Sequence, residues 1–204
     1  MTAEKIDFRS GDLVLEGLLT RADGSRGVVV THPHPLYGGN MQNNVVRAIT
    51  RAYREAGYTT LRFNFRGVGA SQGGFDNGRG EQKDVEAALQ YLLSLGCDWL
   101  DLAGYSFGSW VNAMGAEIFS EVERLIMVSP PVAVMDFSAL GFTPKIRMVI
   151  SGSHDDIAPP EMITKVIGTG NPDATFTVLE GADHFYGGRE GDLEKVIKEF
   201  LEGA

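Results

Sequence analysis

The sequence predicts an α/β protein in which a mostly parallel, twisted sheet of about eight strands carries helices on both faces. From residue 27 onward, short apolar runs typical of buried strands recur along the chain. Segments with apolar residues at helical spacing lie between these runs, most clearly at 193–201. Strands that alternate with helices pair in parallel and are covered on both sides, so the fold class follows from the alternation.

The first twenty residues differ from this pattern. Apolar and polar residues alternate on either side of Ser10, Gly11 and Asp12, which predicts a β-hairpin. Buried strands are then predicted at 28–30, 60–65, 99–103, 125–128, 146–150 and 176–179. Helices are predicted at 44–55, 82–95 and 193–201, with another apolar helix after residue 106. We expect the two longest irregular stretches, 66–80 and 129–144, to be functional loops.

Length, charge and apolar patterning exclude several classes of protein. The 204 residues suit one domain, 1–204, and a net charge of −9 offers no basic face for a nucleic acid. No apolar run approaches the ~18 residues of a membrane span, and the first residues have no apolar signal segment. The single cysteine, Cys97, cannot form an internal disulfide, so we expect a cytoplasmic protein. The sequence does not determine whether the protein forms a homodimer.

A nucleophilic serine in an α/β sheet can occupy a sharp strand-to-helix turn with the pattern Gly-x-Ser-x-Gly. The pattern occurs around Ser71 and again around Ser106. Ser71 precedes a glycine-rich run that cannot continue as a helix, so we interpret it as a loop residue. Ser106 follows the predicted strand 99–103 and precedes an apolar helical segment. Ser106 is therefore the candidate nucleophile, and the alternative is a serine that only caps the helix.

A serine hydroxyl needs a neighbouring base, and an acid should fix the tautomer of that base. His184 follows the last predicted strand, at the sheet edge where the loops after parallel strands converge. The acid is expected between the serine and the histidine in the chain, and both Asp155 and Asp156 follow the strand 146–150. We favour Asp155, because the charge of Asp156 suits the start of a helix.

These motifs resemble the segments that carry the nucleophile, the acid and the histidine in the α/β-hydrolase superfamily. The segments that carry the resemblance are 32–40, 61–69, 104–108, 152–159 and 181–184. The first two are similar to a group of small bacterial and archaeal hydrolases without a lid, related to dienelactone hydrolases and short-chain carboxylesterases. The similarity covers roughly residues 12 to 200. Dienelactone hydrolases use cysteine where this chain has Ser106, so their specific activity is not implied.

The resemblance implies an oxyanion hole built from two backbone N–H groups. One comes from the residue after the nucleophile, here Phe107, and the other from the loop after the third strand. The two prolines of that loop have no N–H, which leaves His34 and Leu36. We favour Leu36, because the glycines that follow it let the loop fold back over the site.

No cofactor or metal is expected. His32 and His34 lie two residues apart with no third ligand nearby, which is weak support for zinc. The glycine-rich stretch 67–73 is not a dinucleotide fingerprint, because Gln72 stands where the third glycine is needed.

The expected function is acyl transfer on a small molecule. We rank the expected reactions as follows. Hydrolysis of a small carboxylic ester through an acyl-enzyme on Ser106 is the first expectation, cleavage of a thioester or small amide is the second, and cleavage of a lactone or C–C bond is the third. The alternative from another class is a non-catalytic binding protein that keeps the fold. Many lipases of this superfamily insert a helical cap before the seventh strand, and the 16 residues 129–144 are too short to form one. We therefore expect a site without a lid that accepts short acyl chains.

Overall fold

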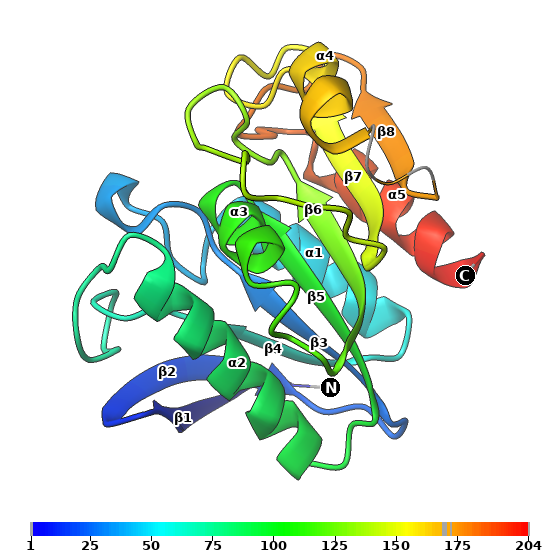
Figure 1. Cartoon of the computed structure of the whole chain (residues 1–204). Helices are drawn as coiled ribbons and strands as arrows, with labels where there is room; N and C mark the ends of the chain where they lie inside the picture. Colours follow the sequence, from blue (N-terminus) through cyan, green and yellow to red (C-terminus); the bar gives the residue numbers. More distant parts are fainter. Residues whose placement is uncertain (1, 169–170, 172, 204) are drawn as a thin grey trace.

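The computed structural model of the protein describes residues 2–168, 171 and 173–203. Its centre is an eight-stranded sheet in the order β1-β2-β4-β3-β5-β6-β7-β8 (Figure 1). β2 pairs antiparallel with both of its neighbours, and the other neighbouring strands pair in parallel. The strands are β1 (Glu4–Ser10), β2 (Leu13–Thr20), β3 (Arg26–Thr31), β4 (Thr59–Phe63), β5 (Trp99–Tyr105), β6 (Val122–Val128), β7 (Ile146–Gly152) and β8 (Thr175–Leu179).

Helices cover both faces of the sheet, with α2 and α3 on one face and α1 and α5 on the other (Figure 1). The predicted fold class is therefore confirmed. The short helix α4 leads into a π-helical segment, Thr164–Gly168, and neither was predicted. The helices are α1 (Asn44–Glu55), α2 (Arg79–Ser94), α3 (Phe107–Met114), α4 (Pro160–Ile163) and α5 (Glu190–Glu202).

Each face of the sheet has its own apolar core, and β3 contributes to both. Val29 belongs to the core beneath α2, whereas Val28 and Val30 belong to the core beneath α1. All three are fully buried, as expected where successive side chains of a central strand point to opposite, covered faces. This explains why the central strands appear in the sequence as continuous apolar runs.

The β1–β2 hairpin has one covered face. Phe8 and Leu15 lie opposite each other in the register and are buried, while their neighbours along the strands are more exposed. The Phe8 ring meets the edge of the Phe63 ring at 5.5 Å, which joins the hairpin to β4. The predicted hairpin is therefore present, and the alternation in its sequence reflects one-sided burial.

Helix α2 begins at Arg79, three residues before the predicted start. The carboxylate of Glu81 accepts the N–H groups of Asp76 at 2.9 Å and Gly78 at 2.8 Å. This side chain caps the helix by satisfying backbone donors that precede it. The cap fixes the end of the glycine-rich loop 66–78, which borders the site described below.

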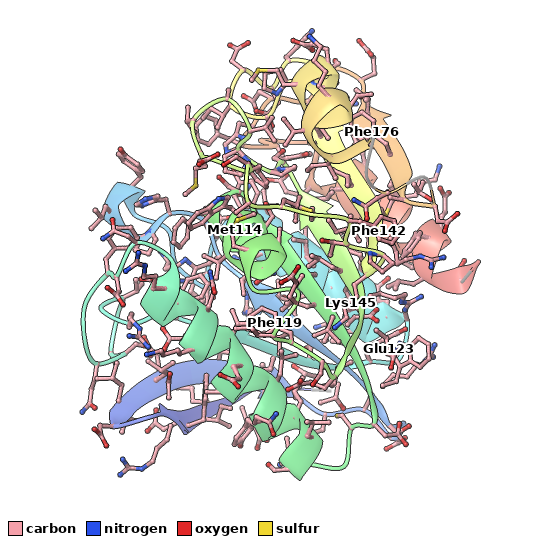
Figure 2. All side chains as sticks on the ribbon, in the orientation of Figure 1. Met114, Phe119, Glu123, Phe142, Lys145 and Phe176 are labelled. Atoms are coloured by element: carbon pink, nitrogen blue, oxygen red, sulfur yellow. The ribbon has the colours of Figure 1, made fainter. Side chains whose placement is uncertain are left out.

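The connection between β6 and β7, residues 129–145, forms no cap domain. Val132 and Phe137 are buried in the core, whereas Phe142 is exposed (Figure 2). At the end of this connection, the ammonium of Lys145 donates to the carbonyl of Phe119 at 2.5 Å (Figure 2). The segment therefore packs on the α3 side of the sheet.

A buried ion pair lies near the amino-terminal ends of β5 and β6. Arg124 donates to both carboxylate oxygens of Asp101, at 3.0 and 2.8 Å, and also to the hydroxyl of Tyr58 at 2.5 Å. These groups lie at the sheet end opposite the loops that follow the parallel strands, so we assign them to stability. Among the helices in the described part of the chain, none is long and apolar enough to cross a bilayer.

Candidate active site

Ser106 is the single residue between the end of β5 and the start of α3. Its backbone has φ 53° and ψ −119°, a conformation that residues other than glycine rarely adopt. Its N–H donates to the carbonyl of Val128 at the end of β6, over 2.9 Å. The neighbouring strand therefore holds a strained turn at the carboxyl edge of the sheet, which is the geometry of a nucleophile elbow.

The two glycines of this elbow are required because a Cβ atom at either position would come too close to neighbouring atoms. A Cβ atom on Gly104 would lie 2.6 Å from the amide nitrogen of Asn112 and 2.6 Å from the backbone nitrogen of Ser109. A Cβ atom on Gly108 would lie 2.6 Å from the hydroxyl oxygen of Thr31. The strand and the helix can therefore approach this closely only because both positions lack side chains.

The structure brings Ser106, His184 and Asp155 together. The Nε2 atom of His184 lies 3.0 Å from Oγ of Ser106, and Nδ1 lies 2.9 and 3.0 Å from the two carboxylate oxygens of Asp155. All three residues are buried, and Ser106 keeps 8% of its surface exposed. This arrangement favours the tautomer in which Nδ1–H donates to Asp155 and Nε2 accepts the Ser106 proton.

Backbone contacts join the loops that carry the acid and the histidine. The N–H of His154 donates to the carbonyl of Ala182 at 2.9 Å. A Cβ atom on Gly152 would lie 2.1 Å from the same carbonyl oxygen, so only glycine allows this approach. Asp155 points inward to His184, whereas Asp156 is exposed.

The Asp155 carboxylate accepts several hydrogen bonds besides that from His184. Its Oδ1 atom accepts the backbone N–H groups of Ile157 at 3.0 Å and Ala158 at 2.8 Å. Burial alone would raise the pKa of this carboxyl. The hydrogen bond and charge of His184, together with Ser129 and the Ala158 N–H, outweigh burial and lower the pKa below its usual value. Asp155 therefore stays ionised as the partner of the imidazole.

Ser71, in the second Gly-x-Ser-x-Gly match, lies in a loop and no helix follows it directly. Its hydroxyl donates to the carbonyl of Asn64 at 2.7 Å and accepts the N–H of Glu16 at 3.1 Å. Both bonds tie the loop after β4 to its surroundings. The interpretation of Ser71 as a loop residue agrees with this geometry.

The structure does not favour Leu36 as an oxyanion donor. Its N–H donates to the Nδ1 atom of His34 at 3.2 Å, within the turn Pro35–Tyr37. Burial lowers the pKa of His34, so its ring stays neutral and can accept this bond. The ring of His34 also packs against Phe107 at 4.7 Å. Among the described residues, the backbone N–H groups of His34 and Phe107 have no protein acceptor.

His32 is a structural residue. Its Nδ1–H donates to the carbonyl of Pro33 at 2.6 Å, and its Nε2 accepts the N–H of Phe65 at 3.0 Å. Burial lowers its pKa to about 4 against a partly opposing hydrogen bond to Pro33. Both ring nitrogens are engaged by backbone, so His32 has none free to bind a metal.

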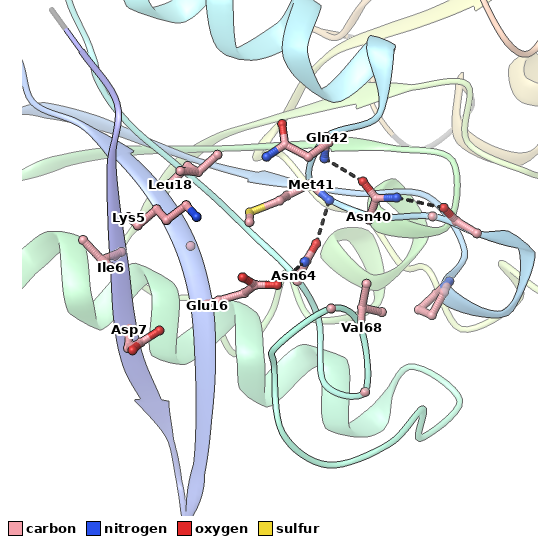
Figure 3. Close-up of a pocket in the computed structure, with 16 residues that line it drawn as sticks. Lys5, Ile6, Asp7, Glu16, Leu18, Asn40, Met41, Gln42, Asn64 and Val68 are labelled. Atoms are coloured by element: carbon pink, nitrogen blue, oxygen red, sulfur yellow. Dashed lines mark hydrogen bonds between the residues drawn. The ribbon is translucent and has the colours of Figure 1, made fainter.

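A pocket of about 730 Å³ lies between the hairpin and the loops that follow β3 and β4. Figure 3 shows Asn64 among the residues that line it, between Glu16 and Met41; its Oδ1 accepts the Met41 N–H at 2.7 Å and its Nδ2 donates to Glu16 at 2.7 Å. Neither Ser106 nor His184 lines it, although Gly38 and Gly39 do. The pocket is therefore a neighbour of the turn that carries His34 and does not contain the Ser106 hydroxyl.

Sequence reasoning missed three hydroxyl residues around the triad. The hydroxyl of Tyr105 donates to the backbone carbonyl of His184 at 2.8 Å. The hydroxyls of Ser129 and Tyr186 lie 2.9 Å apart, and both residues are buried. In the sequence, Tyr105 directly precedes Ser106 and Tyr186 follows His184 by two residues, but no spacing rule links Tyr186 to Ser129.

Several proteins of known structure have a similar architecture. A structure of an α/β serine hydrolase homologue from Coxiella burnetii is 36% identical and superposes with a TM-score of 0.91 over 98% of both chains. A serine hydrolase without a lid from Xanthomonas campestris is 31% identical, with a TM-score of 0.90 over 99% of this chain and 94% of its own. An uncharacterised protein of Rickettsia prowazekii is 33% identical over 97% of this chain and 88% of its own. No family model matches the sequence.

The chain belongs to the α/β-hydrolase superfamily, among the serine hydrolases without a lid. The eight-stranded sheet, the elbow at Ser106 and the short connection between β6 and β7 agree with this assignment. The fold and these relatives support a hydrolase function.

Proposed function

We propose that this protein hydrolyses a small carboxylic ester or thioester through an acyl-enzyme on Ser106. The observation that carries the proposal is the continuous hydrogen-bonded series from Ser106 through His184 to Asp155, at 3.0 and 2.9 Å. A serine hydroxyl in this arrangement is activated, because the base that takes its proton is in reach and correctly oriented. A protein that only bound ligands would not need such a series.

In the first half-reaction, Oγ of Ser106 attacks the carbonyl carbon of the ester while its proton moves to Nε2 of His184. The imidazolium that forms is stabilised by the ionised Asp155 carboxylate at Nδ1. When the tetrahedral intermediate collapses, the C–O or C–S bond breaks and the imidazolium donates its proton to the departing alcohol or thiol. Water then repeats the sequence on the acyl-enzyme, which releases the acid and restores Ser106.

The negative charge on the tetrahedral intermediate needs fixed donors. Phe107 supplies one, since its N–H is the first of α3 and has no acceptor within the helix. For the second donor we propose the N–H of His34 in place of Leu36, because the Leu36 N–H is already bonded to the His34 ring. In this arrangement the ring of His34 holds the turn, and its backbone serves the oxyanion.

The open surroundings of Ser106 favour small acyl groups. Residues 129–145 form no cap, and Leu36, Tyr37 and Phe185 are exposed in the loops on either side of the site. A shallow apolar rim of this kind buries a few methylene groups at about 0.8 kcal/mol each and leaves a longer chain in water. The rate should therefore stop rising after a few carbons.

The proposal is tested by measuring kcat/KM for p-nitrophenyl acetate, butyrate, octanoate and palmitate, with thioesters and amides of acetate beside them. We expect the largest values for acetate or butyrate esters and no increase above the micelle threshold. Ser106→Ala should abolish turnover of every substrate. A maximum at palmitate would overturn the small-acyl proposal, and turnover that survives in Ser106→Ala would overturn the acyl-enzyme.

A further inference from the structure

The ring of His32 is bonded to the peptide unit that carries the N–H of His34. Its Nδ1 atom lies 2.6 Å from the carbonyl oxygen of Pro33, and this carbonyl shares one peptide unit with the His34 N–H. In a trans peptide the C=O and N–H bonds point in opposite directions. A bond that holds the Pro33 carbonyl on one side therefore aims the His34 N–H to the other side.

The two partners of the His32 ring determine which nitrogen carries the proton. The backbone N–H of Phe65 lies 3.0 Å from Nε2 and can only donate, so Nε2 accepts. The Pro33 carbonyl can only accept, so Nδ1 carries the proton and donates. The Phe65 ring also packs against the His32 ring, with centroids 4.7 Å apart. The segment after β4 thus fixes the buried ring, and the ring holds the Pro33 carbonyl.

The orientation of this peptide has no support from regular structure. Neither Pro33 nor His34 belongs to a strand or helix. The proline ring fixes φ of residue 33, but the peptide still turns about ψ of Pro33 and φ of His34. Within the described part of the chain, only the His32 ring donates a hydrogen bond to the Pro33 carbonyl. Gly39 encloses the same oxygen, because a Cβ atom there would lie 2.0 Å from it.

The held peptide lies beside the nucleophile elbow. A Cβ atom on Gly108 would lie 2.8 Å from the carbonyl oxygen of His32, and the ring of His34 packs against the Phe107 ring at 4.7 Å. The segment 32–34 therefore runs along the turn that carries Ser106. A donor stabilises an oxyanion best when it is already fixed before the charge develops, so the direction of the His34 N–H affects the rate.

We propose that His32 is a positioning residue for the oxyanion hole, whose Nδ1–H holds the Pro33 carbonyl so that the His34 N–H faces the tetrahedral intermediate. His32 touches no substrate and transfers no proton. The inference rests on the proposed function, in which Ser106 attacks and the N–H groups of His34 and Phe107 receive the oxyanion.

Two amide variants separate the two bonds of the ring. The amide of asparagine branches from Cγ, so in His32→Asn its NH2 group replaces Nδ1–H as the donor to Pro33. The amide of glutamine branches from Cδ, so in His32→Gln its oxygen replaces Nε2 as the acceptor for Phe65. We expect His32→Gln to lower kcat for p-nitrophenyl acetate roughly tenfold at unchanged KM, less than the loss of about 10² to 10³ on removing a donor, because the N–H remains but is less well aimed. His32→Asn should keep most of the wild-type kcat.

Unfolding in urea separates positioning from a purely structural role. His32→Asn leaves the buried N–H of Phe65 unpaired, whereas His32→Gln frees only the carbonyl of the partly exposed Pro33. We therefore expect the lower urea midpoint in His32→Asn and the lower kcat in His32→Gln. If kcat follows the urea midpoint in both variants, His32 acts only through stability and the proposal is wrong.

Gly39→Ala acts on the same peptide without changing His32. Its Cβ atom would push against the Pro33 carbonyl, so kcat should fall. Gly74→Ala is the control, because a Cβ atom there would meet no atom within 4 Å, and it should keep the wild-type kcat. A wild-type kcat in Gly39→Ala would overturn the proposal even where the His32 variants fail to fold.

Binding of phenylboronic acid examines the oxyanion hole without turnover, because the boron forms a tetrahedral, negatively charged adduct with an activated serine. Its dissociation constant, measured by calorimetry, should rise in His32→Gln by the factor by which kcat/KM falls, and stay near the wild-type value in His32→Asn. An active wild type with unchanged kcat and boronate affinity in His32→Gln would overturn the inference and leave the proposed function standing. A wild type that neither hydrolyses the ester nor binds the boronic acid would overturn the function, and the inference with it.

Discussion

The Nε2 atom of His184 lies 3.0 Å from Oγ of Ser106, although 78 residues separate them in the chain. The distance is set by topology, because both residues follow parallel strands whose carboxyl ends meet at one edge of the sheet. The elbow fixes Ser106 from one side, and the contact between Gly152 and Ala182 fixes the His184 loop from the other.

The acid is tested by comparing Asp155→Asn with Asp156→Asn. An amide at 155 keeps the shape but cannot stabilise the imidazolium, so we expect kcat to fall by about 10³ to 10⁴. Asp156 is exposed, and its amide variant should lose less than about tenfold. Steady-state kinetics on p-nitrophenyl acetate measures both, and a larger loss at Asp156 would transfer the role to that residue.

The close approach of strand and helix at the elbow is tested by Gly104→Ala. The added Cβ atom would lie 2.6 Å from a backbone nitrogen, so the variant should lose about 1 to 3 kcal/mol in the free energy of unfolding. Gly191→Ala is the control, since a Cβ atom added at this position in α5 would have no neighbour within 4 Å. Alanine there should leave stability unchanged or raise it. Equal unfolding midpoints in urea for Gly104→Ala and the wild type would contradict the packing argument.

The buried His32 predicts a loss of stability in acid. Its pKa is about 4 in the folded protein and near 6.5 in the unfolded chain, so below pH 6.5 the unfolded state binds a proton that the folded state does not. Its contribution is fully present above pH 6.5 and falls by roughly 3 kcal/mol as the pH drops to about 4.

His32→Gln removes this titration. Urea unfolding of both proteins at pH 7 and pH 4.5 measures the difference, and the free energy of unfolding should fall less steeply in the variant. Parallel losses in the two proteins would show that His32 is not held neutral.

Patterns that depend on topology were predictable from the sequence. The parallel sheet, the strand before Ser106 and the placement of Asp155 and His184 after later strands follow from apolar runs and chain order. The catalytic roles of these three residues stay predictions, although their side chains meet in space. The favoured donor Leu36 illustrates a detail that the sequence does not contain, because its N–H is taken by the ring of His34 in a short turn.

Contacts between side chains that are distant in the chain could not be predicted from the sequence, for a different reason. The Ser129 and Tyr186 hydroxyls meet across 57 residues, and their encounter depends on strained backbone angles at both positions. No propensity or spacing predicts a left-handed serine or tyrosine, since the surrounding packing imposes it. Such residues become visible only once the loops are placed.

The acyl-enzyme on Ser106 is tested most directly by labelling with a fluorophosphonate, followed by mass spectrometry of the proteolytic peptides. We predict one adduct, on Ser106, in the wild type and in Ser71→Ala, and none in Ser106→Ala or His184→Ala on the same timescale. An adduct on Ser71, or labelling of Ser106 at full rate without His184, would contradict the account.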